Sequence, residues 1–415
     1  MLLRKLLAIF LALCISFSLI CIPKIRSIMI GVPEEISVTQ LRAVSDNAEI
    51  ARAQIETEIA RNLNYGKTYQ KFAGTTIYEK SQKNSNIMVM GSSELMLDFL
   101  PQNPVNFFRK RVSDFDMYLQ GEAGYLSLEH AIELGSFDQV MKNRKVVLII
   151  SPQWFTKDGI IPTDFFPHFS PYHFERFLKN DSVSTETKNK VANRVKELYL
   201  GGPIQGTEVK KSISFIKNAV PVSFFKTYKK TLEPLNSLIE SKNAITPYNE
   251  SIATLSSKST KRAQEIDWQA EFAQAEVDGK VFCTTNDFNI RDDFFNTFIK
   301  PSLESLKGSD LNESYDGSCE YDDLKLFLQV CKETRITPMI ISIPLNGKWY
   351  DYTGFHPFER QKHYENIKKI ASDYNVKLSD LTNHEYDSYF FCDPVHIGWK
   401  GWLHVNQSVY NFYKE

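Results

Sequence analysis

Four short apolar segments and a weaker fifth, which alternate with helical patterns, constrain the fold of this chain more than any other feature. The segments are residues 86–90, 115–119, 146–150, 338–343 and 376–381. Helical periodicity covers residues 93–100, 126–143, 321–335, 357–374 and 398–413. Near-continuous apolar strands that alternate with helices are typical of a parallel sheet covered on both faces. The sequence therefore predicts an α/β protein with three layers around a parallel sheet of about five strands.

A long interruption, residues 155–315, separates the third and fourth predicted strands. It is rich in Phe, Tyr, Lys and Asn, with helical periodicity in places and no clear strand alternation. We predict a largely helical insertion on the carboxyl side of the sheet, within an α/β domain over residues 86–415. Ligand crevices of open α/β sheets lie outside the carboxyl ends of the strands, so the insertion is expected to border the substrate site.

The N-terminus carries an uncharged apolar run, residues 6–22, with Arg4 and Lys5 before it. An apolar helix of about 17–25 residues can cross a bilayer, and preceding cationic residues favour an inside N-terminus. A cleaved signal peptide, a lipoprotein signal and an uncleaved anchor are the alternatives. The run has no small-residue cleavage pattern at its end, and the residues before Cys21 are too bulky for a lipoprotein site.

We therefore predict an uncleaved single-pass transmembrane anchor over residues 1–24, with a short cytoplasmic N-terminus. Residues 25–85 are predicted to form a stalk or helical region. The protein is expected at the cell membrane, with its α/β domain outside the cell.

The charge balance argues against a nucleic-acid partner. The 415 residues include 49 Lys and Arg against 50 Asp and Glu, a formal net charge of −1, whereas a nucleic-acid binder is expected to be basic. Of the six cysteines, those beyond the apolar run are Cys283, Cys319, Cys331 and Cys392. No C-x-x-C pair exists, so neither a metal nor another cofactor is predicted. Disulfides are permitted outside the cell, but the spacing does not say which cysteines pair.

A serine pair follows the first predicted strand, in the stretch Gly91-Ser92-Ser93-Glu94. A serine there would lie at the carboxyl edge of the sheet and at a helix N-terminus, where backbone N–H groups favour developing negative charge. The alternative is a structural one, because serine is a favoured N-cap and an acidic residue suits the first turn of a helix.

A histidine with a nearby carboxylate precedes the last predicted helix, in Cys392-Asp393-Pro394-Val395-His396. Pro394 disfavours helix at the preceding residue, so the stretch is expected to be a loop. In such a loop Asp393 can accept the Nδ1–H of His396, which leaves Nε2 free to take a proton from a serine. Cys392 is an alternative nucleophile, but it stands beside the base rather than opposite it.

Together, the two elements resemble the SGNH/GDSL hydrolase superfamily, with G-S-S where that superfamily has G-D-S. The resemblance implies an SGNH, flavodoxin-like sheet, with Ser93 as nucleophile and Asp393 and His396 completing a triad. It also implies an oxyanion hole made by a glycine after the second strand, here Gly124, and an asparagine after the third. Gln153 stands near that last position, in Ser-Pro-Gln-Trp, and offers the same amide donor.

Four longer motifs resemble the DltD family, extracytoplasmic proteins of teichoic acid D-alanylation in Gram-positive bacteria. They are GSSEL, ISPQWF, NGKWYDYTGF and DPVHIGWKGW, in that order. The resemblance implies D-alanyl transfer to lipoteichoic acid hydroxyls by a serine-hydrolase type acyltransferase. It further implies a multi-pass membrane acyltransferase and a D-alanyl carrier protein as partners, and places Trp154 at the substrate site.

The third motif has two interpretations. Asn346-Gly347 reads as a turn after the fourth strand, so that Trp349 and Tyr350 simply pack over the sheet edge. Alternatively these aromatic residues contact substrate, with Lys348 meeting a phosphate. Two other functions compete with acyl transfer: a thioesterase or esterase that uses the same triad with water, and a non-catalytic membrane-tethered module that recruits the carrier protein.

Overall fold

The computed structural model describes residues 86–96, 100–111, 115–157, 159–161, 164–165, 168–169, 171–200 and 266–415. The predicted anchor and stalk, residues 1–24 and 25–85, lie outside these residues. Within the described residues, no helix combines the length and the apolar character needed to span a bilayer.

A parallel sheet of five strands confirms the predicted α/β class. The strands are β1 (Asn86–Met90), β2 (Asp116–Gln120), β3 (Lys145–Ile150), β4 (Thr337–Ser342) and β5 (Lys377–Asp380), in the order β2-β1-β3-β4-β5. Each coincides with a predicted strand to within two residues at either end. The order reverses next to β1, since the chain moves from β1 to one neighbour and then returns to the other side. That reversal is the switch point at which doubly wound sheets bind ligands.

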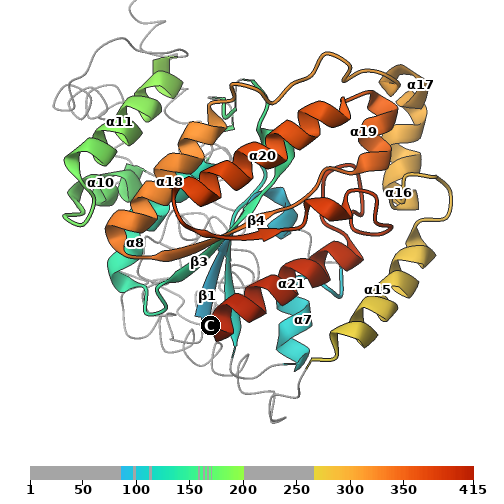
Figure 1. Ribbon diagram of the computed structural model, residues 1–415, viewed down its shortest axis with the longest axis horizontal. Coiled ribbons are helices and arrows are strands. Elements are labelled where there is room, and N and C mark those ends of the chain that lie inside the picture. The colour runs from blue at the N-terminus through green and yellow to red at the C-terminus, as the bar shows by residue number, and fades with distance from the viewer. Residues whose placement is uncertain are drawn as a thin grey trace, which may run out of the picture. The chain divides into compact units, whose positions relative to one another are not determined.

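Helices cover both faces of the sheet (Figure 1). One face carries α7 (Pro104–Arg111) and α21 (Trp399–Lys414), and the other carries α8 (Ser127–Phe137), α18 (Glu320–Thr334) and α20 (Pro357–Asp373). Right-handed crossovers explain the division, because the β1-to-β2 connection runs in the opposite direction to the other three.

The core lies between the sheet and α21. Alternate residues of the strands, such as Val89, Val147 and Ile341, are buried against Trp402 and Val405 of α21. Full burial of one such aliphatic side chain is worth about 1.5–3 kcal/mol. This packing fixes the N-terminal half of α21, and with it the loop that precedes the helix.

The helices differ from prediction in several places. The pattern over residues 93–100 is a short 3₁₀ helix, η1 (Ser93–Met96), with residues 97–99 outside the described part. The helix α7 was not predicted, because an eight-residue segment that begins at Pro104 shows too few periods for recognition. The expected turn after β4 continues into a helix, α19 (Gly347–Thr353). Asn346 caps that helix by accepting the Trp349 N–H, and Gly354 ends it with φ +87°.

The described part of the insertion is helical and contains no strand. Its long helices are α10 (Pro171–Lys179), α11 (Thr185–Leu200) and α15 (Trp268–Phe282). They pack respectively against α8, α18 and α21, and so thicken the helical layers. Short turns follow: α16 (Asp292–Phe294), η4 (Phe295–Ile299), η5 (Lys300–Ser302) and α17 (Leu303–Leu306). The segment that follows α15 reaches the loop before α21 at the carboxyl edge of the sheet.

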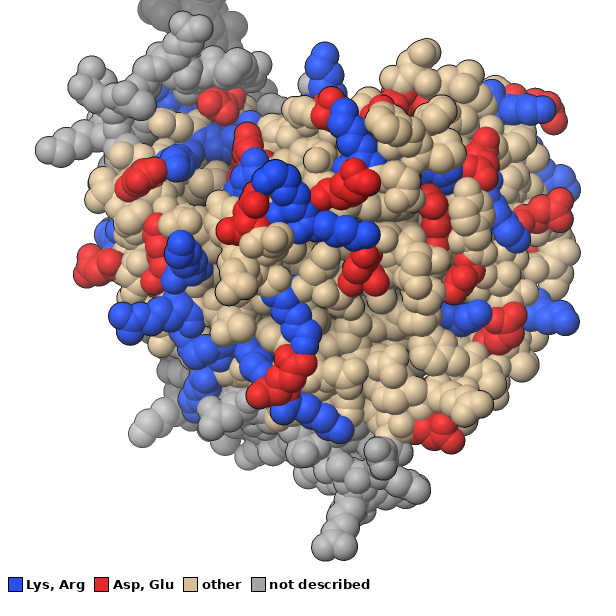
Figure 2. Space-filling view, viewed as in Figure 1, with Lys and Arg blue, Asp and Glu red and all other residues tan. Residues whose placement is uncertain are grey.

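Charged side chains of both signs are interspersed over the face formed by α18 and α20 (Figure 2). Ion pairs within these helices include Lys325–Asp322 and Lys369–Asp373, and Lys368 of α20 pairs with Asp380 of β5. Exposed pairs of this kind are each worth about 0–1 kcal/mol. They indicate solvated helix faces rather than a basic binding surface.

Candidate active site

The turn after β1 places Ser93 at the switch point of the sheet. Gly91 donates its N–H to Gln120 O at 3.1 Å, which ties the turn to the end of β2. A Cβ on Gly121 would lie 1.9 Å from Gly91 O, so the two turns can approach only because this position is glycine. Ser92 is buried and donates its hydroxyl to Glu122 O at 3.2 Å, in the turn after β2. Ser93 opens η1.

Ser93, His396 and Asp393 form a chain of hydrogen bonds. Asp393 Oδ2 accepts Nδ1–H of His396 at 2.7 Å, and His396 Nε2 lies 2.8 Å from Ser93 Oγ. Because Nδ1 carries the proton toward the carboxylate, Nε2 is the unprotonated nitrogen of the neutral ring and accepts the serine O–H. Ser93 and His396 are 303 residues apart in sequence.

Backbone contacts fix the loop that carries Asp393 and His396. Asp393 Oδ1 accepts the N–H groups of Val395 and His396 at 2.9 and 2.8 Å. Phe391 and Ile397 form an antiparallel bridge, which closes the loop before α21. The carboxylate is therefore oriented by three donors, and its side chain is 7% exposed.

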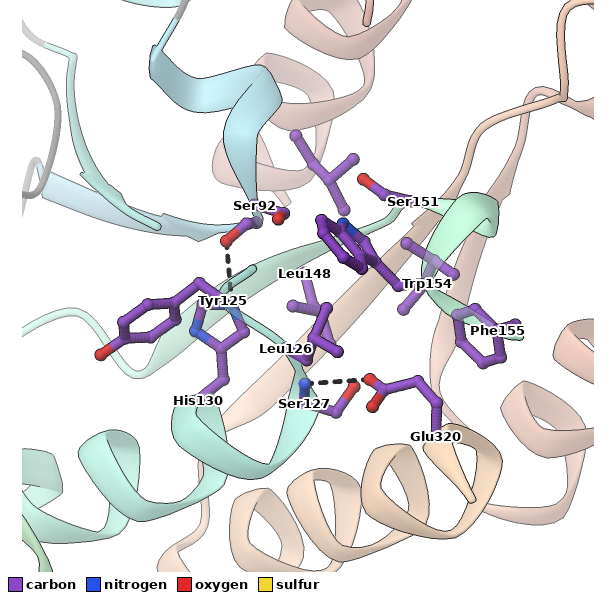
Figure 3. Close-up of a pocket in the computed structure, with 13 residues that line it drawn as sticks. Ser92, Tyr125, Leu126, Ser127, His130, Leu148, Ser151, Trp154, Phe155 and Glu320 are labelled. Atoms are coloured by element: carbon purple, nitrogen blue, oxygen red, sulfur yellow. Dashed lines mark hydrogen bonds between the residues drawn. The ribbon is translucent and has the colours of Figure 1, made fainter. Parts of the chain in front are cut away.

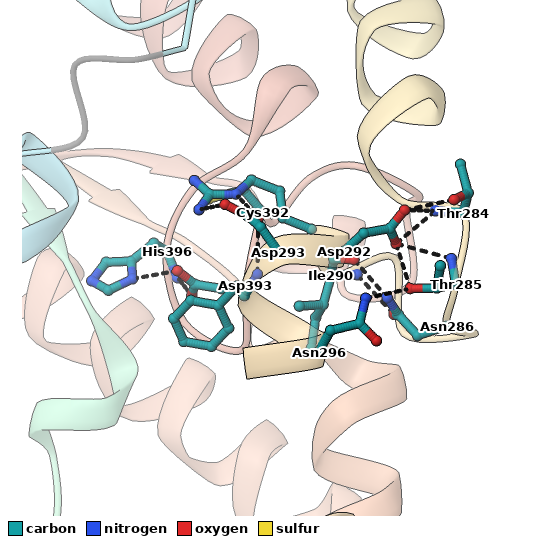
Figure 4. A network of polar contacts seen from close by, with 12 residues as sticks. Thr284, Thr285, Asn286, Ile290, Asp292, Asp293, Asn296, Cys392, Asp393 and His396 are labelled. Carbon is teal, nitrogen blue, oxygen red and sulfur yellow. Dashed lines mark hydrogen bonds and ion pairs between the residues drawn. The ribbon is translucent and has the colours of Figure 1, made fainter. Parts of the chain in front are cut away.

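Residues 284–293 of the insertion lie beside this loop (Figure 4). Arg291 donates its backbone N–H to Cys392 O at 2.9 Å, and its guanidinium donates to the Asp293 carboxylate at 2.8 and 2.9 Å. Asp292 accepts from Thr284 and Thr285, which fixes the preceding turn. Arg291 thus brings one positive charge near the histidine.

The pKa of His396 is raised above its usual range. Burial alone lowers the pKa of an imidazole, but the hydrogen bond and charge of Asp393 and the charge of Glu94 outweigh burial and the opposing charge of Arg291. The protonated ring is therefore stabilised in this site. That is the state that forms when a base takes a proton from serine.

The contacts of the Glu94 side chain were not predicted from the sequence. The side chain is buried and folds under the turn, where it accepts the Ser92 N–H at 2.7 Å and the Ser151 hydroxyl at 2.9 Å. Burial raises its pKa, partly offset by these donors and by the charge of His396. The sequence indicated only an acidic residue in a first helical turn. The contact with the β3 turn depends on tertiary structure.

The two predicted oxyanion donors lie in the turns after β2 and β3. Gly124 has φ +79°, a left-handed conformation suited to glycine. Within the described part of the chain, neither its N–H nor that of Ser93 has a hydrogen-bond acceptor. Gln153 is partly exposed in the 3₁₀ turn η3 (Pro152–Trp154). The N–H groups of Ser93 and Gly124 are thus available to a ligand. Among the described residues, no contact joins these groups to Gln153.

A small cavity lies behind the serine turn, and Trp154 forms part of its wall (Figure 3). It measures about 20 Å³, room for roughly one water. His130 lines it and donates Nε2–H to Gly91 O at 3.0 Å. Burial lowers the pKa of His130 to about 3, so the ring is neutral. Glu320 accepts the Ser127 N–H at 2.9 Å on the opposite side.

The residues of the third motif sit on α19, beyond β4. Trp349 and Tyr350 are buried, with ring contacts to Phe288 at 5.5 Å and Phe355 at 5.8 Å. Lys348 lines a separate cavity of about 10 Å³. No direct contact joins these three side chains to Ser93 within the described residues. Tyr350 is nevertheless close enough to Asp393 that burial and that charge both raise the pKa of its phenol.

One group of side chains has the composition of a metal site: His384, Asp387 and His404, with ligand atoms within 4.8 Å of one another. The imidazole centroids are 4.0 Å apart and the ring planes are tilted by 32°. Asp387 accepts from His384 Nδ1 at 2.7 Å, so that nitrogen already has a partner.

The four cysteines of the described residues are free thiols. Cys392 is fully buried, and burial raises the pKa of its thiol well above the usual range. A thiol that stays protonated is a poor nucleophile. The geometry thus favours Ser93 over Cys392 as the partner of His396.

Fold and contacts together define an α/β protein with a serine, a histidine and an aspartate joined at the carboxyl edge of its sheet. Residues 64–414 match the family described as DltD protein. The chain is 32% identical over 357 residues to protein DltD of Bacillus subtilis (strain 168), covering 83% of this chain and 86% of that protein. It is 28% identical over 343 residues to protein DltD of Staphylococcus aureus (strain NCTC 8325 / PS 47), covering 82% and 85%. The chain belongs to the DltD family.

Proposed function

We propose that this protein transfers D-alanyl groups to hydroxyls of lipoteichoic acid through an ester formed on Ser93. Membership of the DltD family implies a part in the D-alanylation of teichoic acid. The observation that supports a covalent route is the continuous hydrogen-bond chain from Ser93 through His396 to Asp393. A hydroxyl bonded to an oriented base is the arrangement that nucleophilic catalysis needs.

In the first half-reaction, Ser93 Oγ attacks the carbonyl carbon of the D-alanyl donor while His396 Nε2 takes the serine proton. The carbonyl π pair moves to oxygen, then returns and expels the donor's leaving group, which receives the proton from His396. Ser93 now carries the D-alanyl ester. In the second half-reaction a polymer hydroxyl gives its proton to His396 and attacks that ester. Collapse of the intermediate restores the Ser93 hydroxyl.

Three donors are proposed for the negative oxygen of each tetrahedral intermediate: the N–H groups of Ser93 and Gly124, and the amide of Gln153. The first two have no acceptor within the described residues, which supports their assignment. Trp154, next to Gln153, would border the acyl group. Lys348 would meet a phosphate of the polymer, and Trp349 and Tyr350 would support that end of the site.

The remaining parts of the proposal concern location and partners. The apolar run over residues 6–22 would anchor the protein in the cell membrane, with the α/β domain outside. A multi-pass membrane acyltransferase would supply the acyl group, which it draws from a D-alanyl carrier protein. Both are expectations from the family resemblance.

Trapping of the acyl-enzyme tests the proposal. Membranes that contain the full chain and its pathway partners are given D-alanyl donor, quenched with acid and digested for mass spectrometry. We expect a D-alanyl ester on the Ser93 peptide, present in Ser92→Ala and absent in Ser93→Ala. If the ester forms and is lost to water at the same rate with and without teichoic acid, the protein is a hydrolase. If D-alanylation proceeds in Ser93→Ala, the protein acts as a non-catalytic module.

A further inference from the structure

Glu94 joins two loops that meet at the proposed catalytic centre. Oε1 accepts from Ser92 N at 2.7 Å within the β1 turn, and Oε2 accepts from the Ser151 hydroxyl at 2.9 Å at the end of β3. The first turn presents Ser93, and the second leads directly to Gln153. One carboxylate thus sets the spacing between the nucleophile and a proposed oxyanion donor.

The turn is built around this carboxylate. A Cβ on Gly91 would lie 2.4 Å from Glu94 Oε1, so glycine is needed to let the side chain fold beneath the turn. Glu94 itself is 1% exposed. The carboxylate accepts the N–H of the residue that precedes η1 and also reaches the end of β3, so it does more than cap the short helix.

The electrostatic surroundings of Glu94 consist of hydrogen-bond donors and one histidine. Within the described part of the chain, no lysine or arginine forms an ion pair with it, and the positive group that acts on it is His396. Buried carboxylates are costly unless paired or hydrogen-bonded. Glu94 therefore has its two donors at rest and gains a cationic partner when His396 is protonated.

We propose that Glu94 is a positioning residue for the reaction: its carboxylate fixes the Ser93 turn against the Ser151–Gln153 turn and stabilises the imidazolium of His396 alongside Asp393. This role rests on the proposed function in one respect: the imidazolium of His396 is formed during acyl transfer. Charged groups that act on His396 are Asp393 from its own loop, Glu94 from η1 and Arg291 from the insertion.

Two substitutions separate charge from position. Glu94→Gln removes the charge but keeps both contacts, because a glutamine oxygen can accept the Ser92 N–H and its amide can donate to the Ser151 hydroxyl. Ser151→Ala keeps the charge and removes the bridge between the turns. Both are made in a Ser93→Ala background of the full chain, so that no turnover is required.

The readout is the NMR titration of the His396 ring protons. We expect the pKa of His396 to fall in Glu94→Gln and to change little in Ser151→Ala. An equal His396 pKa with and without the Glu94 charge would overturn the electrostatic role. Since the titration involves no acyl donor, failure of D-alanyl transfer would contradict the proposed function and leave this result standing.

Two further measurements complete the test. In Ser93-containing protein, Ser151→Ala should slow labelling of Ser93 by a fluorophosphonate without moving the pH at which the rate is half-maximal. An unchanged rate would contradict the positioning role. If Glu94→Gln does not fold, the reciprocal titration decides, because coupling between two sites is mutual. His396→Gln should raise the pKa of Glu94, followed by a carboxyl ¹³C label, and an unmoved value would overturn the proposal.

Discussion

The loop over residues 390–398 and the helix α19 both lie at the carboxyl edge of the sheet, but they hold their side chains in different ways. In the loop, Asp393 and His396 are fixed by directed hydrogen bonds, and the His396 side chain remains 22% exposed. On α19, Trp349 and Tyr350 are buried among aromatic rings. A motif rich in large side chains can thus serve packing, whereas chemistry needs a polar group that is both oriented and accessible.

The largest expected effect comes from the base. His396→Ala should reduce acyl transfer by roughly 10⁶-fold, the scale seen when a triad histidine is removed. Ser93 then has no acceptor for its proton. The measurement is the rate of D-alanyl incorporation into teichoic acid by membranes that carry the variant. A loss of less than about tenfold would mean that another group serves as base.

A smaller loss is expected from Asp393→Asn, about 10⁴-fold in turnover. The amide can present its NH₂ to His396, which favours the wrong tautomer and turns the Nε2 proton toward Ser93. Thermal unfolding of the variant serves as the control for correct folding. Turnover like that of the unmodified protein would remove Asp393 from the mechanism.

Trp349→Ala should affect stability rather than chemistry. Loss of a buried indole typically costs about 3–5 kcal/mol in the free energy of unfolding, while Ser93 labelling below the melting transition stays unchanged. Urea titration and labelling are measured on the same preparation, with Trp349→Phe as the milder control. A variant of normal stability with impaired transfer would show that the Trp349 side chain acts on the substrate rather than on packing.

The smallest effect is expected from Ser92→Ala. Its hydroxyl makes one bond, to Glu122 O at 3.2 Å, and a neutral hydrogen bond contributes about 0.5–1.5 kcal/mol. Turnover should persist. Abolished transfer in a stably folded Ser92→Ala protein would instead make Ser92 the reacting group.

Much of the fold was predictable because β1, β3 and β4 are nearly continuous apolar runs, whereas β5 gives a weaker signal. All five lie within two residues of their predicted ends, as β1 and β3 illustrate. Residues 393–396 could be interpreted locally, since Pro394 enforces a loop and the spacing lets Asp393 reach its own histidine. The roles assigned from the sequence to Gly124, Gln153 and Lys348 stay predictions.

Other features could not be derived from sequence, because they depend on contacts between distant segments. Ser93 and His396 are 303 residues apart, and only the strand order brings them together. Glu94 appeared to suit a helix dipole, yet its side chain turns under the sheet edge toward Ser151. The helix α19 was interpreted as a turn, because seven residues are too few for a clear helical period.

Labelling of the folded full chain with a fluorophosphonate, followed by peptide mapping, tests most directly whether Ser93 is a nucleophile activated by His396. We expect a single label on Ser93, formed at a rate that rises with pH as His396 loses its proton, and absent from both Ser93→Ala and His396→Ala. A label on Ser92, or labelling that survives Ser93→Ala, would contradict this assignment.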